Sequence, residues 1–285
     1  MPSRETRTLK GSRGRSIVYD VYRPEEGAVG VVALVHGLGE HAGRYEYVAR
    51  RLTDAGYIVI APDHAGHGRS DGAPRNVTDF SDFTADLDRV IKSVELADTG
   101  SGSTLETLPL FVLGHSMGGA IALSYALDHQ DDLRGLVLSG PAVVPGDDLP
   151  PIMVKAAPVL GKLAPWLPST ALSASAVSRD PAVVKAYEDD PLVFHGKIPA
   201  GLGGALIGQM QSLPERLPSL TLPTLALHGG KDVLANPDGS RMVGEKAGGD
   251  DVTVKIYPEL YHEIMNEPER DEVLDDIVAW LDAHL

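Results

Sequence analysis

The sequence predicts an α/β fold in which helices cover both faces of a mostly parallel central sheet, with a helical cap inserted into it. Short runs rich in Val, Ile and Leu alternate with helix-like segments along the 285 residues, as in βαβ units. These runs show little alternation of polar and apolar residues, as expected of strands that are covered on both faces. About eighty residues separate two of the runs, far more than an ordinary strand-to-helix connection needs.

The elements are expected in the following order. Residues 15–23 alternate polar and apolar side chains, and we expect them to pair with residues 5–10 as an antiparallel hairpin at the edge of the sheet. The buried strands expected next are 29–35, 57–62, 108–113, 133–139, 223–227 and 252–257. The helices expected are 44–55, 80–97, 117–129, 237–247 and 267–284.

The long stretch between the expected strands 133–139 and 223–227 predicts two regions. They are a core domain of residues 1–141 and 215–285 and an inserted cap of residues 142–214. Residues 143–178 hold six prolines, nineteen apolar residues and only four charged ones. Apolar residues recur there at near-helical spacing, although Pro158 and Gly161 are expected to kink or split any helix. Such a density of apolar residues outside the sheet pattern indicates an oily surface over a pocket. The alternative is an extra packing layer with no role at a site.

Composition excludes several classes of protein. The chain has no cysteine, which removes disulfides, thiolate metal sites and a cysteine nucleophile. Its formal net charge of -15 argues against nucleic acid as a partner, and its simplest interpretation is a soluble acidic surface. We find neither an apolar run of about 18 residues nor a signal-peptide pattern at the start. We therefore expect a cytoplasmic protein, with peripheral contact at a membrane or lipid surface as a further expectation.

A nucleophilic serine is predicted from its position between a strand and a helix. The pattern G-x-S-x-G occurs twice, at residues 68–72 and 114–118. Ser116 follows the expected strand 108–113 and precedes the expected helix 117–129, as a nucleophile elbow requires. Ser70 lies among turn residues and has neither flank, so we interpret it as structural. Ser116 is therefore the predicted nucleophile. Its position predicts that the α/β fold is the α/β-hydrolase fold in particular.

Two backbone N–H groups are candidates to stabilise an oxyanion. The Met117 N–H lies at the start of the helix that follows the elbow, where the helix N-terminus favours negative charge. The second donor should come from the loop after strand 29–35, which reads HGLGEH over residues 36–41, and we choose Leu38. A simple tight turn would explain the glycines of this loop, but not its place beside the elbow at the carboxyl edge of the sheet.

A serine nucleophile needs a base, and the base needs an orienting acid. In this fold the chain order is Ser, then Asp or Glu, then His. The histidines that follow Ser116 are His129, His195, His228, His262 and His284. We select His262, because it lies in the loop between the last strand and the last helix. Asp232, just beyond strand 223–227, is the predicted acid, and its competitor Asp238 stands where an aspartate would cap a helix.

At this point several motifs together resemble a known family. They are HGLGEH at 36–41 followed by Arg44 and Tyr45, DHAGHGRS at 63–70, GHSMG at 114–118, SRDP at 178–181, DPLV at 190–193 and YHE at 261–263. From about residue 17 to the end, the chain resembles the bacterial monoacylglycerol lipases, the serine aminopeptidase S33 or lysophospholipase-like branch of the fold. One departure is Met265, which stands where some animal members have a second histidine three residues after the base.

The resemblance implies specific roles for these residues. It implies a triad of Ser116, Asp232 and His262, with oxyanion donors at Leu38 and Met117. It further implies that Glu40 and Arg44 shape or bind the glycerol end of a substrate. The alternative for Glu40 and Arg44 is an ion pair that only holds the loop.

The cap should line an acyl tunnel and contact lipid. The residues expected to make these contacts are Met153, Leu160, Leu163, Trp166 and Leu167. The alternative for each of them is packing on the main domain alone.

The expected reaction is two-step hydrolysis of a monoacylglycerol ester to fatty acid and glycerol, with no metal or organic cofactor. A broader carboxylesterase or lysophospholipase of the same fold would share every feature but the substrate. Dehalogenase or epoxide-hydrolase chemistry is disfavoured, because those enzymes usually carry aspartate at the position of Ser116. A non-catalytic binding protein on this fold would usually have lost a member of the triad.

Overall fold

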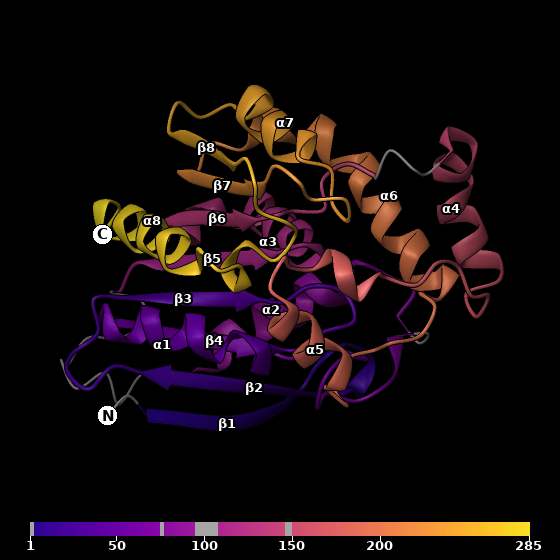
Figure 1. The fold of residues 1–285 in the computed structure, drawn as a ribbon. Helices are drawn as coiled ribbons and strands as arrows, with labels where there is room; N and C mark the ends of the chain where they lie inside the picture. The colour runs from indigo at the N-terminus through magenta and orange to yellow at the C-terminus, as the bar shows by residue number, and fades with distance from the viewer. Residues whose placement is uncertain (1–2, 75–76, 95–107, 146–149) are drawn as a thin grey trace.

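The computed structural model describes residues 3–74, 77–94, 108–145 and 150–285. Residues 95–97 of the expected helix 80–97 and residues 146–149 of the expected cap lie outside this description. Within it, the centre of the molecule is an eight-stranded sheet (Figure 1). The strands are β1 (Ser3–Lys10), β2 (Ser16–Arg23), β3 (Gly30–Val35), β4 (Tyr57–Pro62), β5 (Leu110–His115), β6 (Gly135–Ser139), β7 (Thr224–Gly229) and β8 (Val252–Tyr257).

The strand order across the sheet is β1-β2-β4-β3-β5-β6-β7-β8. Strands β1 and β2 form the expected antiparallel edge hairpin, and β2 is antiparallel to β4. All pairs from β4 to β8 are parallel. The predicted α/β fold is therefore confirmed. Because the carboxyl ends of parallel strands meet at one edge, the loops after β3, β5, β7 and β8 converge there.

Eight α-helices accompany the strands in the part of the chain that the structure describes. They are α1 (Glu46–Asp54), α2 (Ser81–Ser93), α3 (Met117–Asp128), α4 (Pro151–Leu163), α5 (Pro181–Asp189), α6 (Ala200–Arg216), α7 (Asp238–Lys246) and α8 (Arg270–Ala283). Helix α1 starts later than expected, because the chain first forms a short 3-10 helix over Ala42–Tyr45.

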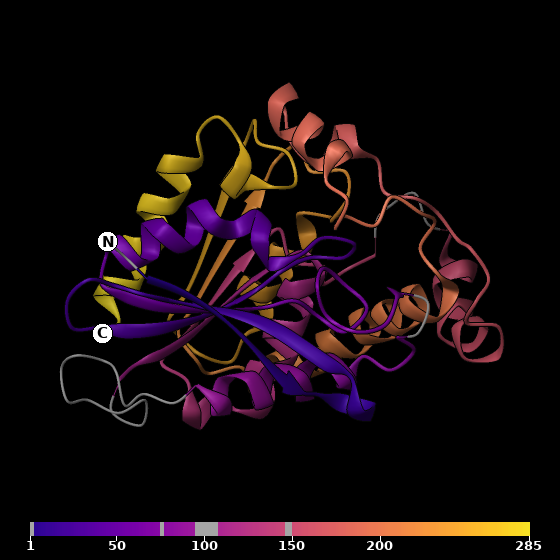
Figure 2. The same ribbon diagram turned by 90° about the horizontal axis from the view of Figure 1, so that it is seen from below.

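Alternate residues of each central strand enter opposite halves of the core. In β3, Val31, Ala33 and Val35 belong to the half that includes Phe83 of α2 and Ile121 of α3. Val32 and Leu34 belong to the half that includes residues of α1 and α8. Figure 2 shows α1 and α8 on one face of the sheet and α2 and α3 on the other. Burial on both faces explains why these strands are continuously apolar in sequence.

The segment between β6 and β7 carries α4, α5 and α6, and Figure 1 shows α4 and α6 side by side beyond the carboxyl edge of the sheet. Pro158 and Gly161 were expected to kink or split a helix here; they do not split it, since α4 is continuous through both. A Cβ on Gly161 would stand 2.5 Å from the Ala200 carbonyl oxygen of α6. This glycine therefore permits two helices to approach closely rather than ending one of them.

Among the described residues, no helix combines the length and apolarity that crossing a lipid bilayer requires.

Candidate active site

Ser116 occupies a sharp turn between β5 and α3. Its backbone has φ 56° and ψ −121°, a region that non-glycine residues rarely adopt. The turn is held by the Ser116 N–H, which donates to the Ser139 carbonyl of β6 at 3.0 Å. A Cβ on Gly118 would stand 2.1 Å from the Val35 carbonyl oxygen, so only glycine lets α3 begin so close to β3. Ser116 thereby lines a cavity at the carboxyl edge of the sheet.

His262 and Asp232 meet at this same edge, from the loops after β8 and β7. Nδ1 of His262 lies 2.7 Å from Oδ2 of Asp232. Because a carboxylate can only accept, Nδ1 carries the proton and Nε2 is left as the basic nitrogen. His262 lines the cavity that Ser116 lines, and its ring centroid lies 4.7 Å from that of His115, the residue before the serine.

The two partners shift each other's proton affinity. Burial lowers the pKa of His262, but the charge and the hydrogen bond of Asp232 outweigh it and raise that pKa above its ordinary value. Burial likewise opposes ionisation of Asp232, yet His262 and further hydrogen bonds hold the pKa of Asp232 well below its usual range. The carboxylate therefore stays charged at neutral pH, while the imidazole is prepared to take up a proton.

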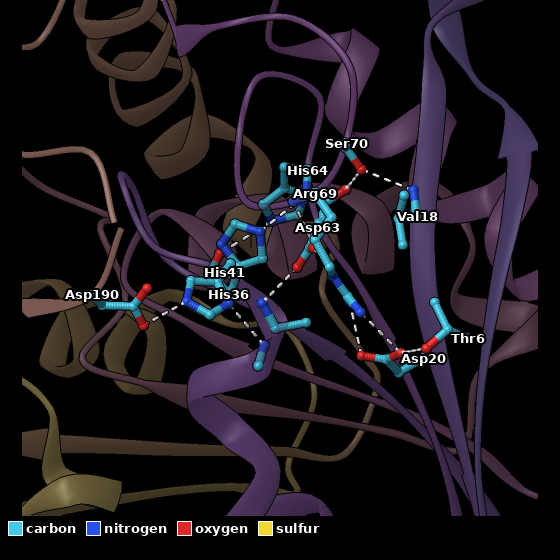
Figure 3. A network of polar contacts seen from close by, with 12 residues as sticks. Thr6, Val18, Asp20, His36, His41, Asp63, His64, Arg69, Ser70 and Asp190 are labelled. Atoms are coloured by element: carbon cyan, nitrogen blue, oxygen red, sulfur yellow. Dashed lines mark hydrogen bonds and ion pairs between the residues drawn. The ribbon is translucent and has the colours of Figure 1, made fainter. Parts of the chain in front are cut away.

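The loop after β3 is oriented by a buried histidine (Figure 3). The backbone N–H of His64 donates to Nε2 of His36 at 2.9 Å, so the ring proton of His36 is on Nδ1, which donates to the Gly37 carbonyl at 2.8 Å. A trans peptide points its C=O and the next N–H in opposite directions, so this bond fixes the direction of the Leu38 N–H. Leu38 and Met117 both line the cavity.

A network of buried charged side chains supports the loop after β3. Asp63, at the end of β4, accepts from the Ala42 N–H at 2.8 Å and from Nε of Arg69 at 2.7 Å. Arg69 also donates to Asp20 on β2 (Figure 3). Ser70, from the second G-x-S-x-G pattern, donates to the Asp63 carbonyl at 2.6 Å. Ser70 is buried and does not line the cavity, so its hydroxyl serves the scaffold.

The loop is also tied to the inserted segment. Nε2 of His41 lies 2.9 Å from a carboxylate oxygen of Asp190, which follows α5 (Figure 3). The Phe194 N–H donates to the Gly39 carbonyl at 2.7 Å. Contacts between the loop after β3 and the segment after α5 therefore link the predicted oxyanion loop to the insertion.

The cavity has a volume of about 550 Å³ and is lined mainly by apolar side chains. Met153 and Leu160 of α4 line it, as the sequence led us to expect. Leu163, Trp166 and Leu167 do not; they are 73%, 70% and 46% exposed, on the outer surface of the insertion. Sequence reasoning missed the contribution of α6, whose large apolar residues at the cavity are Leu206, Ile207 and Met210. The signal was the apolar spacing within residues 202–210.

Comparisons with known proteins place the chain in a family and match its fold. The family model described as serine aminopeptidase, S33, matches residues 26–269. The chain belongs to this family. It is 48% identical to a monoacylglycerol lipase of Mycolicibacterium smegmatis, over 99% of both chains, and 33% identical to the human monoglyceride lipase, over 99% of this chain and 91% of the other. The crystal structure of the Paleococcus ferrophilus monoacylglycerol lipase superposes with a TM-score of 0.81, at 32% identity and over 100% of both chains.

In this member of the family, Glu40 and Arg44 form the ion pair that was their alternative interpretation. Nη1 of Arg44 lies 2.7 Å from Glu40 and 2.7 Å from Glu263, and Nη2 makes a second bond to Glu263. The other Glu40 oxygen accepts from the Gly37 N–H and the Tyr45 hydroxyl, both at 2.7 Å. Both carboxylates line the cavity, but Arg44 does not.

Sequence reasoning missed Glu263, although its signal was its place directly after His262. Burial disfavours the charged form of Glu263, but Arg44 outweighs it and lowers the pKa of Glu263. Glu40 and Glu263 are thus bound to Arg44 and to the loop. Among the described residues, no cluster of three His, Asp or Glu side chains has the arrangement of a metal site.

Proposed function

We propose that this protein hydrolyses the ester bond of monoacylglycerols to a fatty acid and glycerol, through an acyl-enzyme on Ser116. The observation that carries the proposal is the Asp232–His262 hydrogen bond at the cavity that Ser116 lines. The choice of monoacylglycerols rests on two relatives, 48% and 33% identical, that bear the names monoacylglycerol lipase and monoglyceride lipase.

In the first step, Ser116 Oγ attacks the ester carbonyl carbon while His262 Nε2 takes up its proton. Asp232 keeps the Nδ1 proton in place and stabilises the imidazolium that forms. The Leu38 and Met117 N–H groups hold the negative oxygen of the tetrahedral intermediate. His262 then gives its proton to the glycerol oxygen, and the carbon–oxygen bond breaks.

In the second step, water replaces the serine as the attacking group. His262 takes a proton from the water as its oxygen bonds to the acyl carbon, and a second oxyanion forms at the same two N–H groups. Collapse of this intermediate returns the proton to Ser116 Oγ and releases the fatty acid. Each residue therefore acts twice.

The remaining predicted residues would have different roles at the cavity. Met153 and Leu160, together with the apolar side chains of α6, would contact the acyl chain. Glu40 and Arg44 would shape the glycerol end by holding the loop, because their charged atoms already bond to each other and to neighbours.

The exposed apolar residues of the insertion suit a lipid surface. Leu163, Trp166 and Leu167 are exposed on one inserted segment, and a water-exposed cluster of this kind indicates a binding surface. A strongly acidic chain would gain little from anionic headgroups. We therefore expect the contact to depend on apolar insertion rather than charge.

A hydrolysis panel tests the proposal. Monoacylglycerols of increasing chain length are compared with di- and triacylglycerols and with short p-nitrophenyl esters, using wild type and Ser116→Ala. We expect the highest kcat/KM on monoacylglycerols and a loss of about 10⁶-fold in kcat in the variant. A preference for triacylglycerols or short esters would contradict the substrate assignment, and an active Ser116→Ala would contradict the mechanism.

A further inference from the structure

A second buried histidine contacts the predicted acid. His228 is the penultimate residue of β7, and its side chain is fully buried. Its Nε2 lies 3.1 Å from Oδ2 of Asp232 and 3.1 Å from the Ala235 carbonyl oxygen. Its Nδ1 lies 2.8 Å from the hydroxyl of Ser240 in α7, which is also fully buried. The mechanism above uses neither His228 nor Ser240.

The partners of His228 determine its tautomer. Both groups near Nε2, a carboxylate and a carbonyl, can only accept hydrogen bonds, so Nε2 must carry the proton. A neutral imidazole has one N–H, which leaves a lone pair on Nδ1. The Ser240 hydroxyl must therefore donate to Nδ1. The other tautomer of His228 would place a lone pair against the carboxylate of Asp232.

The carboxylate of Asp232 is thereby held from several directions. Its Oδ2 accepts from both imidazoles, His262 at 2.7 Å and His228 at 3.1 Å. Its Oδ1 accepts from the N–H groups of Leu234 at 2.8 Å and Ala235 at 3.0 Å. The two backbone donors fix one oxygen, and the second imidazole limits rotation of the other away from His262.

We propose that His228, held in one tautomer by the two acceptors at its Nε2, is a positioning residue that aims the Asp232 carboxylate at His262. This inference rests on the proposed function, because it gives His228 a part in the same reaction. Removing the His228 N–H leaves Asp232 charged and still held at Oδ1, but it removes one of the two restraints on Oδ2, so the imidazole of His262 is held less well. The defect belongs to the chemical step, and substrate binding is unaffected.

Two substitutions at position 228 separate positioning from packing. His228→Leu keeps the apolar bulk but removes all three polar contacts. His228→Gln retains an acceptor for Ser240 and an N–H for Asp232. We expect His228→Leu to lower kcat about 10- to 100-fold with KM within about twofold, as for loss of a hydrogen bond to a charged group, and His228→Gln to recover most of the activity. Ser240→Ala removes the partner of Nδ1 but leaves both acceptors at Nε2, so it should lower kcat by a smaller factor.

Proton NMR of the His262 Nδ1–H gives a readout that packing alone would not move. We expect its downfield resonance to shift and broaden in His228→Leu and to remain in His228→Gln, with thermal unfolding checked for every variant. Wild-type kcat in a folded His228→Leu would overturn the inference. So would equal losses in the Leu and Gln variants with an unchanged resonance, because the role would then be packing. A wild type inactive on every ester would instead overturn the proposed function, while the resonance still tests the positioning.

Discussion

At the scale of single residues, the chemistry depends on how one imidazole is held. His262 is buried, which by itself lowers its pKa, and Asp232 reverses that effect. Chain order and edge position were enough to select Asp232 and His262 from the sequence. They could not reveal the support of His228, because its role depends on Ser240, twelve residues further on, and on which ring nitrogen faces which group.

Replacing the predicted acid should change both rate and pH dependence. Asp232→Asn removes the largest contribution that raises the pKa of His262, so burial, which lowers that pKa, is opposed only by the smaller contributions of Glu263 and Glu40. We therefore expect kcat to fall about 10⁴-fold and the acid limb of the kcat/KM–pH profile to move to lower pH. The matched control is Asp238→Asn, which changes an exposed aspartate. An acid limb that stays in place or moves upward in Asp232→Asn would show that another group raises the pKa of His262.

At the scale of elements, the parallel strands and the elbow could be predicted because their patterns are local. Buried strands read as apolar runs, and the turn at Ser116 needs glycine on either side of the serine. The insertion could not be predicted in the same way, because its inner face depends on how α4 packs against α6. Gly161 was expected to kink or split a helix, yet it allows that packing. Trp166 was expected at the tunnel and lies outside it.

The close approach of α4 and α6 should matter for long acyl chains. In Gly161→Ala the new Cβ would stand 2.5 Å from the Ala200 carbonyl oxygen, so the two helices that line the cavity must move apart. We expect kcat/KM for long-chain monoacylglycerols to fall about tenfold, with short p-nitrophenyl esters changed less than about twofold.

Gly208→Ala is the matched control on α6. Its Cβ would meet Pro158 at 3.6 Å, an ordinary contact, so the helices need not move. Equal effects of Gly161→Ala and Gly208→Ala on long-chain substrates would contradict this account of the cavity.

At the scale of the whole molecule, several neutral histidines are built into the core around the site. Burial lowers the pKa of His64 to about 3, of His67 to about 4 and of His115 to about 3, and it lowers the pKa of His36 well below its usual value. Nε2 of His36 now accepts a hydrogen bond from the His64 backbone N–H. Protonation of that nitrogen would turn it into a donor, so two N–H groups would face each other. The scaffold beneath the oxyanion loop therefore requires these rings to be uncharged.

Stability should consequently fall in mild acid. Below pH about 6.5 the unfolded chain protonates these histidines while the folded chain does not, so the unfolded state binds more protons and the free energy of unfolding decreases as pH falls. We expect about 1 kcal/mol lost per histidine between pH 7 and pH 5.5. Denaturant unfolding across this range measures it. His67→Phe should reduce the slope of the free energy of unfolding against pH by the equivalent of one proton. A slope identical to wild type would contradict a neutral, buried His67 in the folded state.

The proposed mechanism requires that Ser116, and no other serine, forms the covalent intermediate. A fluorophosphonate probe followed by peptide mass spectrometry tests it directly, with Ser116→Ala as the matched variant and Ser70 as the internal comparison. We predict one adduct per chain in wild type, on the peptide that contains residues 114–118, and none in Ser116→Ala. An adduct on the peptide that contains Ser70, or undiminished labelling of Ser116→Ala, would rule out Ser116 as the nucleophile.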